Sequence, residues 1–207
     1  GQYDNNRYTE NTIKVDGPLS DESKLILETF SQGLLDADRS LEKLIDYLEE
    51  SDEPTIVVFF GDHLPMLGKR YSVYTESGYI QSNDISMWTT EEALNMRKVP
   101  FIIWSNFKQE KQNIGTINTS FLGPYLLEYM NKELPKYFKF INSIAKVLPV
   151  IGEGFALTPD NMFITEEHEL YKEIIREYNL IQYDQFLGKN YLDKENEDKW
   201  IVKNNPN

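Results

Sequence analysis

Residues 55–60 read Thr-Ile-Val-Val-Phe-Phe, an uninterrupted β-branched and aromatic run that begins directly after Pro54. A strand that faces water on one side alternates apolar with polar side chains, and this run does not alternate. The pattern therefore predicts a strand covered on both faces, as in the middle of a parallel sheet with helices on each side. Residues 99–104, Val-Pro-Phe-Ile-Ile-Trp, repeat the pattern and predict a second strand in the same sheet.

A long helix is expected before the first strand, over residues 21–50. Ser20 is a suitable N-cap, and Asp21 and Glu22 lie in the first turn, where the helix dipole favours acidic groups. Apolar side chains recur at alternating steps of three and four residues and predict one buried face. They are Leu27, Phe30, Leu34, Ala37, Leu41, Leu44 and Leu48. A coiled coil is the alternative, but the repeat covers only about three heptads without systematic flanking charge pairs, which favours a packed helix.

Three further helices are expected in the second half of the chain, over residues 120–130, 136–148 and 166–178. Ser120 and Thr165 are the expected N-caps of the first and the third. One helix, two strands separated by a loop, and then more helices is an order typical of the α/β class. We therefore predict an α/β fold.

Composition restricts the functions open to such a chain. It has 207 residues, of which 40% are hydrophobic, so it can form a proper core. A formal charge of −13 argues against binding to nucleic acid, because phosphate backbones require Lys and Arg surfaces. The chain has no Cys, which excludes disulfides and thiolate chemistry. The sequence contains no run of about 18 apolar residues, so it predicts no transmembrane segment.

Chemistry is expected where the first strand ends, in the sequence Gly61-Asp62-His63. Ligands of open α/β sheets lie at the carboxyl ends of the strands, and a glycine allows consecutive side chains to turn toward one point. A carboxylate beside an imidazole suits Mn²⁺, Zn²⁺ or Mg²⁺. The alternative is an Asx-turn at Asp62 with His63 as an exposed loop histidine.

Longer segments resemble a known family. GLLDADRSLEKLIDYLEES (33–51), a short acidic connector with a proline and then TIVVFFGDHLPMLG (55–68) resemble the alkaline phosphatase and sulfatase superfamily. The likeness is greatest to its lipoteichoic acid synthase-like phosphoglycerol transferases. KVPFIIWSNF (98–107) and LIQYDQFLGKNYL (180–192) resemble segments downstream of the Asp-His pair in bacterial members. The resemblance implies part of an alkaline phosphatase-like sheet with flanking helices.

The resemblance also implies a site and an activity. The Asp-His pair of this family binds metal, so Asp62 and His63 are expected to be metal ligands, for Mn²⁺ or Mg²⁺ with Zn²⁺ as the alternative. The implied substrate is a glycerophosphate lipid or polymer, at the extracellular face of the bacterial cell membrane. Sulfatases, phosphodiesterases and phosphoethanolamine transferases of the superfamily often have Gly directly after the pair. This chain has Leu64-Pro65, which favours the phosphoglycerol branch but leaves the others as alternatives.

Part of the family's machinery is expected to lie elsewhere. A threonine nucleophile and an acidic metal ligand stand well upstream of the pair in family members, whereas only 61 residues precede Asp62 here. We therefore expect residues 1–207 to be the C-terminal portion of a catalytic domain from a membrane-anchored parent, with no catalytic residue and no activity alone. The polar tail, residues 193–207, is expected to fray. A non-catalytic binding or structural module is the alternative of another class, and the substrate-binding residues are unknown.

Weaker candidates lie close to the expected site. Trp104, Ser105 and Asn106 end the second predicted strand at the expected site edge, although core packing and turn formation also explain them. Lys69 and Arg70 follow the Asp-His pair and are candidates for contact with a phosphate, although loop cations are common.

Two further candidates favour structural roles. His168, the other histidine, is expected on a solvated helix surface rather than as a ligand. The segment LPKYFKFINSIAKV (134–147) mixes aromatic residues with lysines and could meet a lipid surface, but a helix packed within the fold is favoured.

Overall fold

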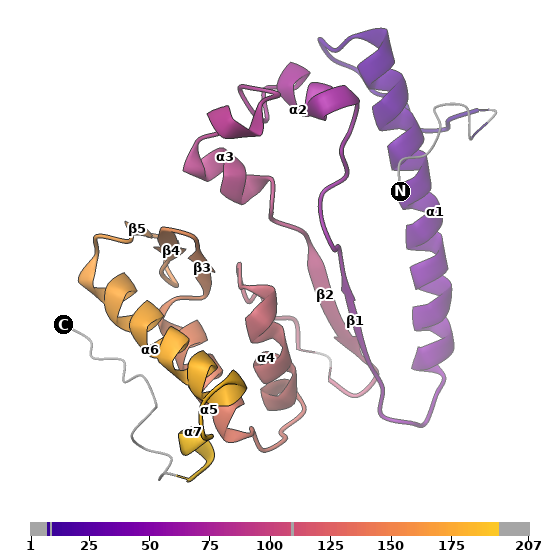
Figure 1. Ribbon diagram of the computed structural model, residues 1–207. Helices are drawn as coiled ribbons and strands as arrows, with labels where there is room; N and C mark the ends of the chain where they lie inside the picture. The colour runs from indigo at the N-terminus through magenta and orange to yellow at the C-terminus, as the bar shows by residue number, and fades with distance from the viewer. Residues whose placement is uncertain (1–7, 9, 109, 195–207) are drawn as a thin grey trace. The chain divides into compact units, whose positions relative to one another are not determined.

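The computed structural model describes residues 8, 10–108 and 110–194, and it divides into two compact units (Figure 1). The first unit comprises residues 1–111 and the second residues 112–207. Each combines helices with a small antiparallel sheet, so the mixed α/β class predicted from the sequence is confirmed. The expected tail falls mainly on residues 195–207, which lie outside the described residues.

The first unit begins with the long helix α1, Asp21–Glu49, close to the predicted bounds. Ser20 is its N-cap, as predicted, and its hydroxyl accepts the Ser23 N–H at 3.2 Å. The same residue also binds Glu76, which accepts the Ser20 N–H at 3.0 Å and its hydroxyl at 3.1 Å. These bonds connect the start of α1 to the end of a second helix, α2, Ser72–Glu76.

The buried side of α1 is not the predicted apolar face. Leu34 and Leu44 of that face are 55% and 46% exposed. The preceding segment binds the helix through polar groups, because Gln32 Oε1 accepts both the N–H and the hydroxyl of Thr12, at 3.0 and 2.8 Å. The buried residues of α1 are Ser23, Thr29, Gln32 and Gly33. The periodicity therefore predicted the helix correctly, but the described residues of the chain cover its apolar stripe only in part.

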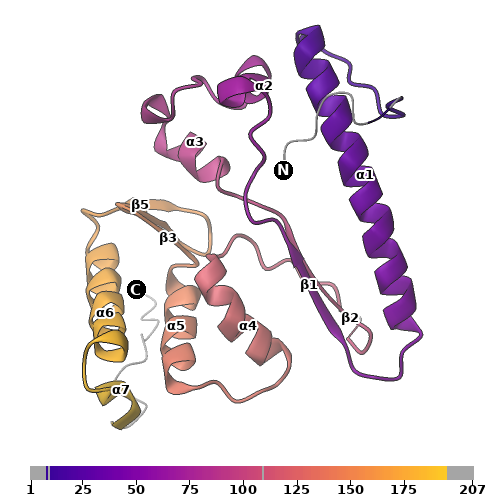
Figure 2. The same ribbon diagram turned by 45° about the vertical axis from the view of Figure 1, so that its right-hand side comes forward.

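Both predicted strands are present and pair with each other. Strand β1 is Ile56–Phe60 and strand β2 is Phe101–Ser105, and they form a two-stranded antiparallel ribbon (Figure 2). The prediction of a central strand in a parallel sheet, buried on both faces, is wrong for this chain, since Phe59 and Ile102 are 47% and 54% exposed. An apolar run shows that both faces can be covered, but it determines neither the direction of the neighbouring strand nor what covers it.

A small helical segment connects the two strands, where a mixed loop was expected. Besides α2 it contains the 3-10 helices η1 (Lys69–Tyr71) and η2 (Ile85–Met87) and the helix α3 (Thr90–Asn95). Leu67, Val73, Ile80 and Met96 are its buried apolar side chains. This segment therefore has a small core of its own, directly after the Asp-His pair.

The second unit contains the predicted helices and a sheet that was not predicted. Its elements are η3 (Thr119–Phe121), α4 (Leu122–Tyr129), α5 (Lys136–Val147), β3 (Val150–Gly152), β4 (Phe155–Leu157), β5 (Phe163–Thr165), α6 (Glu169–Phe186) and α7 (Tyr191–Lys194). Strands β3, β4 and β5 pair antiparallel in chain order. The helix predicted over 166–178 begins later and ends later, and its N-cap is His168 rather than Thr165.

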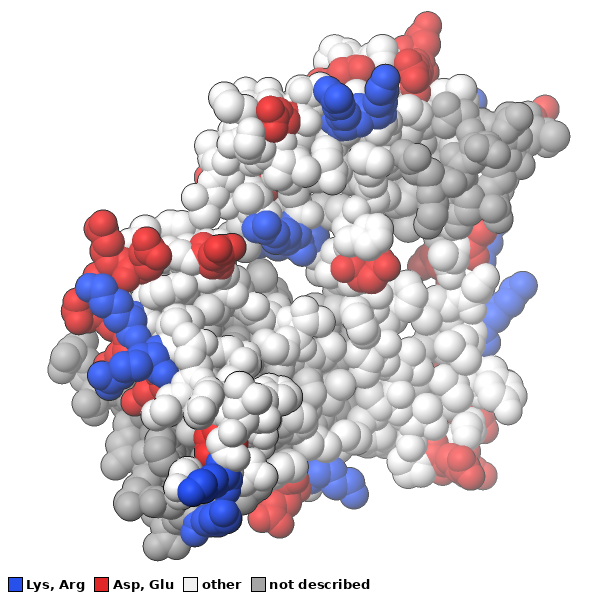
Figure 3. Space-filling model, viewed as in Figure 1, with Lys and Arg blue, Asp and Glu red and all other residues white. Residues whose placement is uncertain are grey.

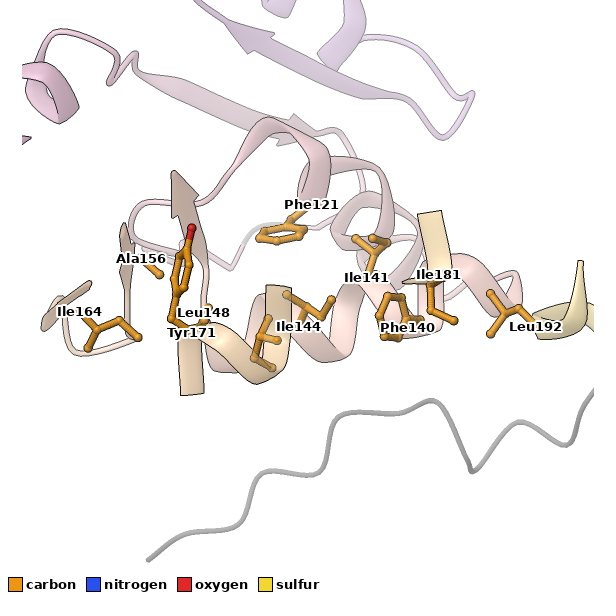
Figure 4. Packing of buried hydrophobic residues seen from close by; sticks show 11 residues of the cluster. Phe121, Phe140, Ile141, Ile144, Leu148, Ala156, Ile164, Tyr171, Ile181 and Leu192 are labelled. Carbon is orange, nitrogen blue, oxygen red and sulfur yellow. The ribbon is translucent and has the colours of Figure 1, made fainter. Parts of the chain in front are cut away.

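One apolar cluster holds the second unit together, and α5 and α6 each contribute three of its side chains (Figure 4). Phe140, Ile141 and Ile144 of α5 are at most 2% exposed. The rest of the cluster comes from η3, α6, α7, the strands and the end of α5: Phe121, Leu148, Ala156, Ile164, Tyr171, Ile174, Ile181 and Leu192. The segment 134–147 is thus a packed helix, the role favoured over a lipid-binding one.

Charged side chains of the described residues are spread over the face shown in Figure 3 rather than gathered by sign. On the described part of the face shown in Figure 3, lysines and arginines stand singly or beside acidic residues, with large uncharged areas between them. The negative formal charge is therefore not concentrated in one patch of this face.

Candidate metal-binding loop

The loop that follows β1 carries the Asp-His pair, at the end of the strand that the sequence indicated. The Gly61 N–H donates to Pro100 O at 3.3 Å, which extends the pairing of the two strands by one bond. A Cβ atom on Gly61 would lie 3.2 Å from the Cβ of Val99. Gly61 therefore allows the ends of the two paired segments, at Gly61 and Val99, to approach closely. The φ of Gly61 lies outside the left-handed region.

Asp62 and His63 point their side chains at each other. His63 Nε2 lies 3.5 Å from Asp62 Oδ2, and both side chains are largely exposed, at 73% and 86%. Two ligand atoms about 2.0–2.2 Å from one ion, at an angle near tetrahedral, stand about 3.4 Å apart. The observed separation of 3.5 Å is close to the spacing of two ligands of a shared ion.

The second nitrogen of the His63 ring is held by the backbone. Nδ1 lies 2.9 Å from Leu64 O, and a carbonyl oxygen can only accept, so Nδ1 carries the proton. In the neutral ring the lone pair is then on Nε2, the atom that faces Asp62. This arrangement, with one ring nitrogen donating to a carbonyl, is the one that orients histidine ligands in metal sites.

The alternative prediction for this loop, a turn stabilised by the Asp62 side chain, is also partly fulfilled. Asp62 Oδ1 accepts the N–H of His63 at 2.9 Å, a local bond that stabilises the turn. This bond uses one carboxylate oxygen and leaves Oδ2 directed at the imidazole. The local role and a ligand role are therefore compatible in the same conformation.

Further ligands are absent from the part of the chain that the structure describes. Within it, no group of three or more His, Cys, Asp or Glu side chains could hold a metal ion. His168 belongs to the second unit, where its exposed side chain accepts the Leu170 N–H at 3.2 Å as the N-cap of α6. It is thus an exposed helix-end residue, as favoured, with a capping role that the sequence analysis assigned to Thr165.

Trp104, Ser105 and Asn106 lie at the wrong end of the ribbon for the site. Because β1 and β2 are antiparallel, Ser105 is opposite Ile56, at the start of β1 rather than at its end. The Asn106 side chain accepts the Thr55 N–H at 2.9 Å, and its amide group faces three carbonyl oxygens. These belong to Leu48, Ser51 and Glu53, at 3.2, 3.1 and 2.9 Å. Asn106 therefore connects α1 to the ribbon and has a structural role.

Lys69 and Arg70 are exposed in η1, close in sequence to the Asp-His pair. Arg70 has φ 51° and the next residue, Tyr71, has φ 60°. Two adjacent non-glycine residues in the left-handed region form an uncommon turn, and the sequence analysis had no signal for it. The structure also shows aromatic contacts around this turn that sequence reasoning missed.

No helix among the described residues is long and apolar enough to cross a membrane.

Comparison with known families gives a match: the model of the family described as Sulfatase matches residues 1–132. The matched range contains the whole first unit, including the Asp-His pair.

Two individual proteins are similar over most of the chain. A Rhizobium meliloti (strain 1021) protein described as "Putative cyclic beta-1,2-glucan modification protein" is 32% identical over 194 residues, which are 92% of this chain and 30% of the relative. The solved structure of Streptococcus pyogenes phosphoglycerol transferase GacH, in complex with sn-glycerol-1-phosphate, aligns with a TM-score of 0.61 at 24% identity. The alignment covers 90% of this chain and 41% of the solved chain, and it shows a likeness of fold. The chain thus spans less than half the length of either protein.

Proposed function

Because the chain belongs to the sulfatase family, we propose that it is part of a metal-dependent transferase that moves phosphoglycerol from a glycerophosphate lipid to an acceptor. The observation that carries the proposal is the loop geometry, with Asp62 Oδ2 and His63 Nε2 3.5 Å apart at the end of β1. Leu64-Pro65 directly after the pair favours the phosphoglycerol branch over sulfate chemistry, and the fold shared with a phosphoglycerol transferase is compatible with that branch.

In the proposed site, Asp62 Oδ2 and His63 Nε2 hold a divalent ion, Mn²⁺ or Mg²⁺ with Zn²⁺ as the alternative. Such an ion, when bound, stabilises negative charge on phosphoryl oxygens and favours ionisation of a bound hydroxyl. Leu64 O fixes the ring tautomer of His63, so that Nε2 stays available as a ligand. The remaining ligands and the nucleophile come, in this proposal, from parts of the protein outside these 207 residues.

The overall transfer balances as an exchange of alcohols on phosphorus. A bond forms between phosphorus and the oxygen of the acceptor hydroxyl, and the bond between phosphorus and the oxygen of the lipid alcohol breaks. The proton of the acceptor hydroxyl ends on the released lipid alcohol. The name of the Rhizobium meliloti relative refers to a glucan, which supports a carbohydrate acceptor. We place the reaction at the extracellular face of a bacterial membrane, where such lipids and glucans meet.

The 207-residue chain should be inert on its own in this proposal. Two protein ligands leave most of the coordination shell of an ion to water, so affinity should be far below that of a complete site. Without a positioned nucleophile, transfer through a covalent intermediate cannot start. The test compares this chain with the longer protein that contains it, on a glycerophosphate lipid with and without Mn²⁺. Metal-dependent turnover is expected from the longer protein alone.

Variants of the longer protein test the ligand roles. Asp62→Asn and His63→Gln should each lower kcat/KM at least about 100-fold, since each removes a charge or lone pair from the ion. Asp52→Asn and His168→Asn are the controls, because Asp52 is exposed outside the loop and asparagine keeps a side-chain acceptor at the N-cap of α6. They should retain activity within about twofold. Turnover that survives the loop variants, or that this chain performs unaided, would refute the proposal.

A further inference from the structure

Four aromatic rings gather in the segment that directly follows the candidate metal-binding loop. The Trp88 ring lies edge-on to Tyr71, with centroids 5.4 Å apart and planes at 67°. The Tyr74 ring lies 6.3 Å from Tyr71 and 5.7 Å from Tyr79. We call these four residues the aromatic cluster. The edge-on geometry is favourable for aromatic pairs, so the rings support one another.

Hydrogen bonds to the backbone hold three of the rings, including a bond of 3.4 Å from the Tyr79 hydroxyl to Asn95 O. Trp88 Nε1 donates to Ser82 O at 2.7 Å, and the Tyr74 hydroxyl donates to Pro65 O at 2.9 Å. Pro65 comes two residues after His63, so the aromatic cluster is attached to the loop that carries the Asp-His pair. Rings fixed in this way lose little freedom when a ligand stacks on them.

The backbone at the edge of the aromatic cluster is strained. Arg70 and Tyr71 have φ 51° and 60°, in the left-handed region that non-glycine residues rarely adopt. The turn begins at Gly68, whose φ is 73° and where an added Cβ would collide with the Ser72 hydroxyl. A tight turn of this kind is retained only because the surrounding structure holds it, and it sets Tyr71 against Trp88.

Two charged residues adjoin Tyr71 and Trp88 along the chain, because Arg70 directly precedes Tyr71 and Asp84 is the N-cap of η2, which ends just before Trp88. Arg70 is exposed and forms no hydrogen bond or ion pair with any residue that the structure describes. Asp84 Oδ1 accepts both the N–H and the hydroxyl of Ser86, at 3.0 and 2.8 Å, which leaves Oδ2 available. The Ser86 bonds, and in smaller part the charge of Arg70, lower the pKa of Asp84, so it is ionised at neutral pH.

We propose that Tyr71 and Trp88, with Arg70 and Asp84 at their edge, form a binding site for one sugar ring of a glucan. A sugar ring has an apolar C–H face, which stacks on aromatic rings, and a rim of hydroxyls, which bond to guanidinium and carboxylate groups. The site combines both features next to the candidate metal-binding loop. The proposal rests on the proposed function for the role of this sugar, which is to bring the acceptor hydroxyl to the phosphoglycerol group.

A purely structural role would explain less of this arrangement. The segment already has a core of buried apolar residues, Leu67, Val73, Ile80 and Met96. Tyr79 is 46% exposed, and the Tyr71 and Trp88 side chains are half-buried rather than enclosed. Packing also gives no reason for an arginine in a strained turn that donates no hydrogen bond to any described residue. Sugar binding accounts for the rings, the free charges and the turn together.

The test measures binding of cyclic β-1,2-glucan to the 207-residue chain by isothermal titration calorimetry, without metal or lipid. Arg70→Gly and Tyr71→Asn remove the side chains while suiting the left-handed backbone, so both variants should fold. Each should weaken glucan binding about tenfold or more, the equivalent of about 1.4 kcal/mol. Arg97→Gly and Tyr47→Asn are the matched controls on exposed residues elsewhere in the unit and should change Kd less than about twofold.

Failure of this inference and failure of the proposed function give different results. If the chain does not bind the glucan at about 10 mM, or if Arg70→Gly and Tyr71→Asn both bind it as tightly as the parent sequence, the sugar site is refuted. In the longer protein, these two variants should keep hydrolysis of the lipid donor but lose transfer to the glucan. A longer protein that consumes no donor under any condition would refute the proposed function while leaving the binding result intact.

Discussion

Replacement of Asn106 is the sharpest test of how the first unit is assembled. Its side chain binds the end of α1, the α1–β1 connection and Thr55, the residue just before β1, at the same time. The carbonyl oxygens of Leu48, Ser51 and Glu53 lie 2.9–3.2 Å from Nδ2, and the Thr55 N–H donates to Oδ1 at 2.9 Å. Two amide protons are therefore shared among three acceptors.

The expected loss follows from this count of bonds. Asn106→Ala removes one accepted bond and two donated protons, each worth about 0.5–1.5 kcal/mol, and water can replace some of them because the site is only part-buried. We expect about 2–3 kcal/mol of destabilisation. Asn106→Asp keeps the acceptor for the Thr55 N–H but sets a carboxylate against three carbonyls. It should be at least as destabilising at pH 7 and should recover toward the alanine variant as acid protonates the new carboxylate.

The measurements are urea unfolding and amide hydrogen exchange. With a slope of about 2 kcal/mol per molar urea, the alanine variant should lower the midpoint by about 1–1.5 M. The Thr55 amide should exchange faster in Asn106→Ala than in Asn106→Asp, because only the latter retains its acceptor. Asn83→Ala and Asn83→Asp are the controls, since Asn83 is exposed and bonds to no described residue. An unchanged midpoint in both Asn106 variants, or identical exchange at Thr55, would contradict the assigned role.

Two predictions concern the second unit. The Leu192 N–H donates to the Asp184 carboxylate at 3.0 Å and is the main cause of the lowered pKa of that carboxylate. The stabilisation by the ionised carboxylate should therefore be complete above about pH 4 and should fade as the pH falls through the lowered pKa. The difference in urea midpoint between the parent sequence and Asp184→Asn should accordingly shrink in acid, and a difference that is constant with pH would contradict this. The Tyr171 hydroxyl accepts the Gly154 N–H and donates to Gly152 O, both at 3.1 Å, so Tyr171→Phe should cost about 1–2 kcal/mol and speed exchange of the Gly154 amide. Tyr183→Phe, at a residue 60% exposed, is the control, and equal effects of the two changes would argue against the hydroxyl bonds.

Local patterns predicted the elements whose signals are long. The helix Asp21–Glu49, its cap Ser20 and the positions of both long strands follow from spacing and side-chain type alone. The three strands of the second unit have three residues each, too few for an alternation to be visible. His168 replaced Thr165 as a cap because the choice depends on where the preceding strand ends, which is a tertiary matter.

Pairing direction and distant contacts could not be predicted, and they decide which residues belong to the site. Asp62 and His63 were found because they are adjacent in sequence and follow an apolar strand. Trp104 was placed beside them on the assumption of parallel strands, and the antiparallel pairing moves it to the opposite end of the ribbon. The contact between Tyr71 and Trp88 spans 17 positions of an irregular segment, for which no periodic signal exists.

Electrostatics gives the two halves of the proposed reaction different requirements. A chain with a formal charge of −13 repels an anionic phosphodiester, so the donor needs a local cation, and the Asp62–His63 pair supplies a place for one. A neutral sugar experiences no such repulsion and can be bound by ring faces and a few hydrogen bonds. The aromatic cluster follows the Asp62–His63 loop in the chain, so the two proposed sites use different side chains. In the proposed reaction, the charged donor would be held through a metal ion, and the uncharged acceptor would be held through Tyr71, Trp88 and their polar neighbours.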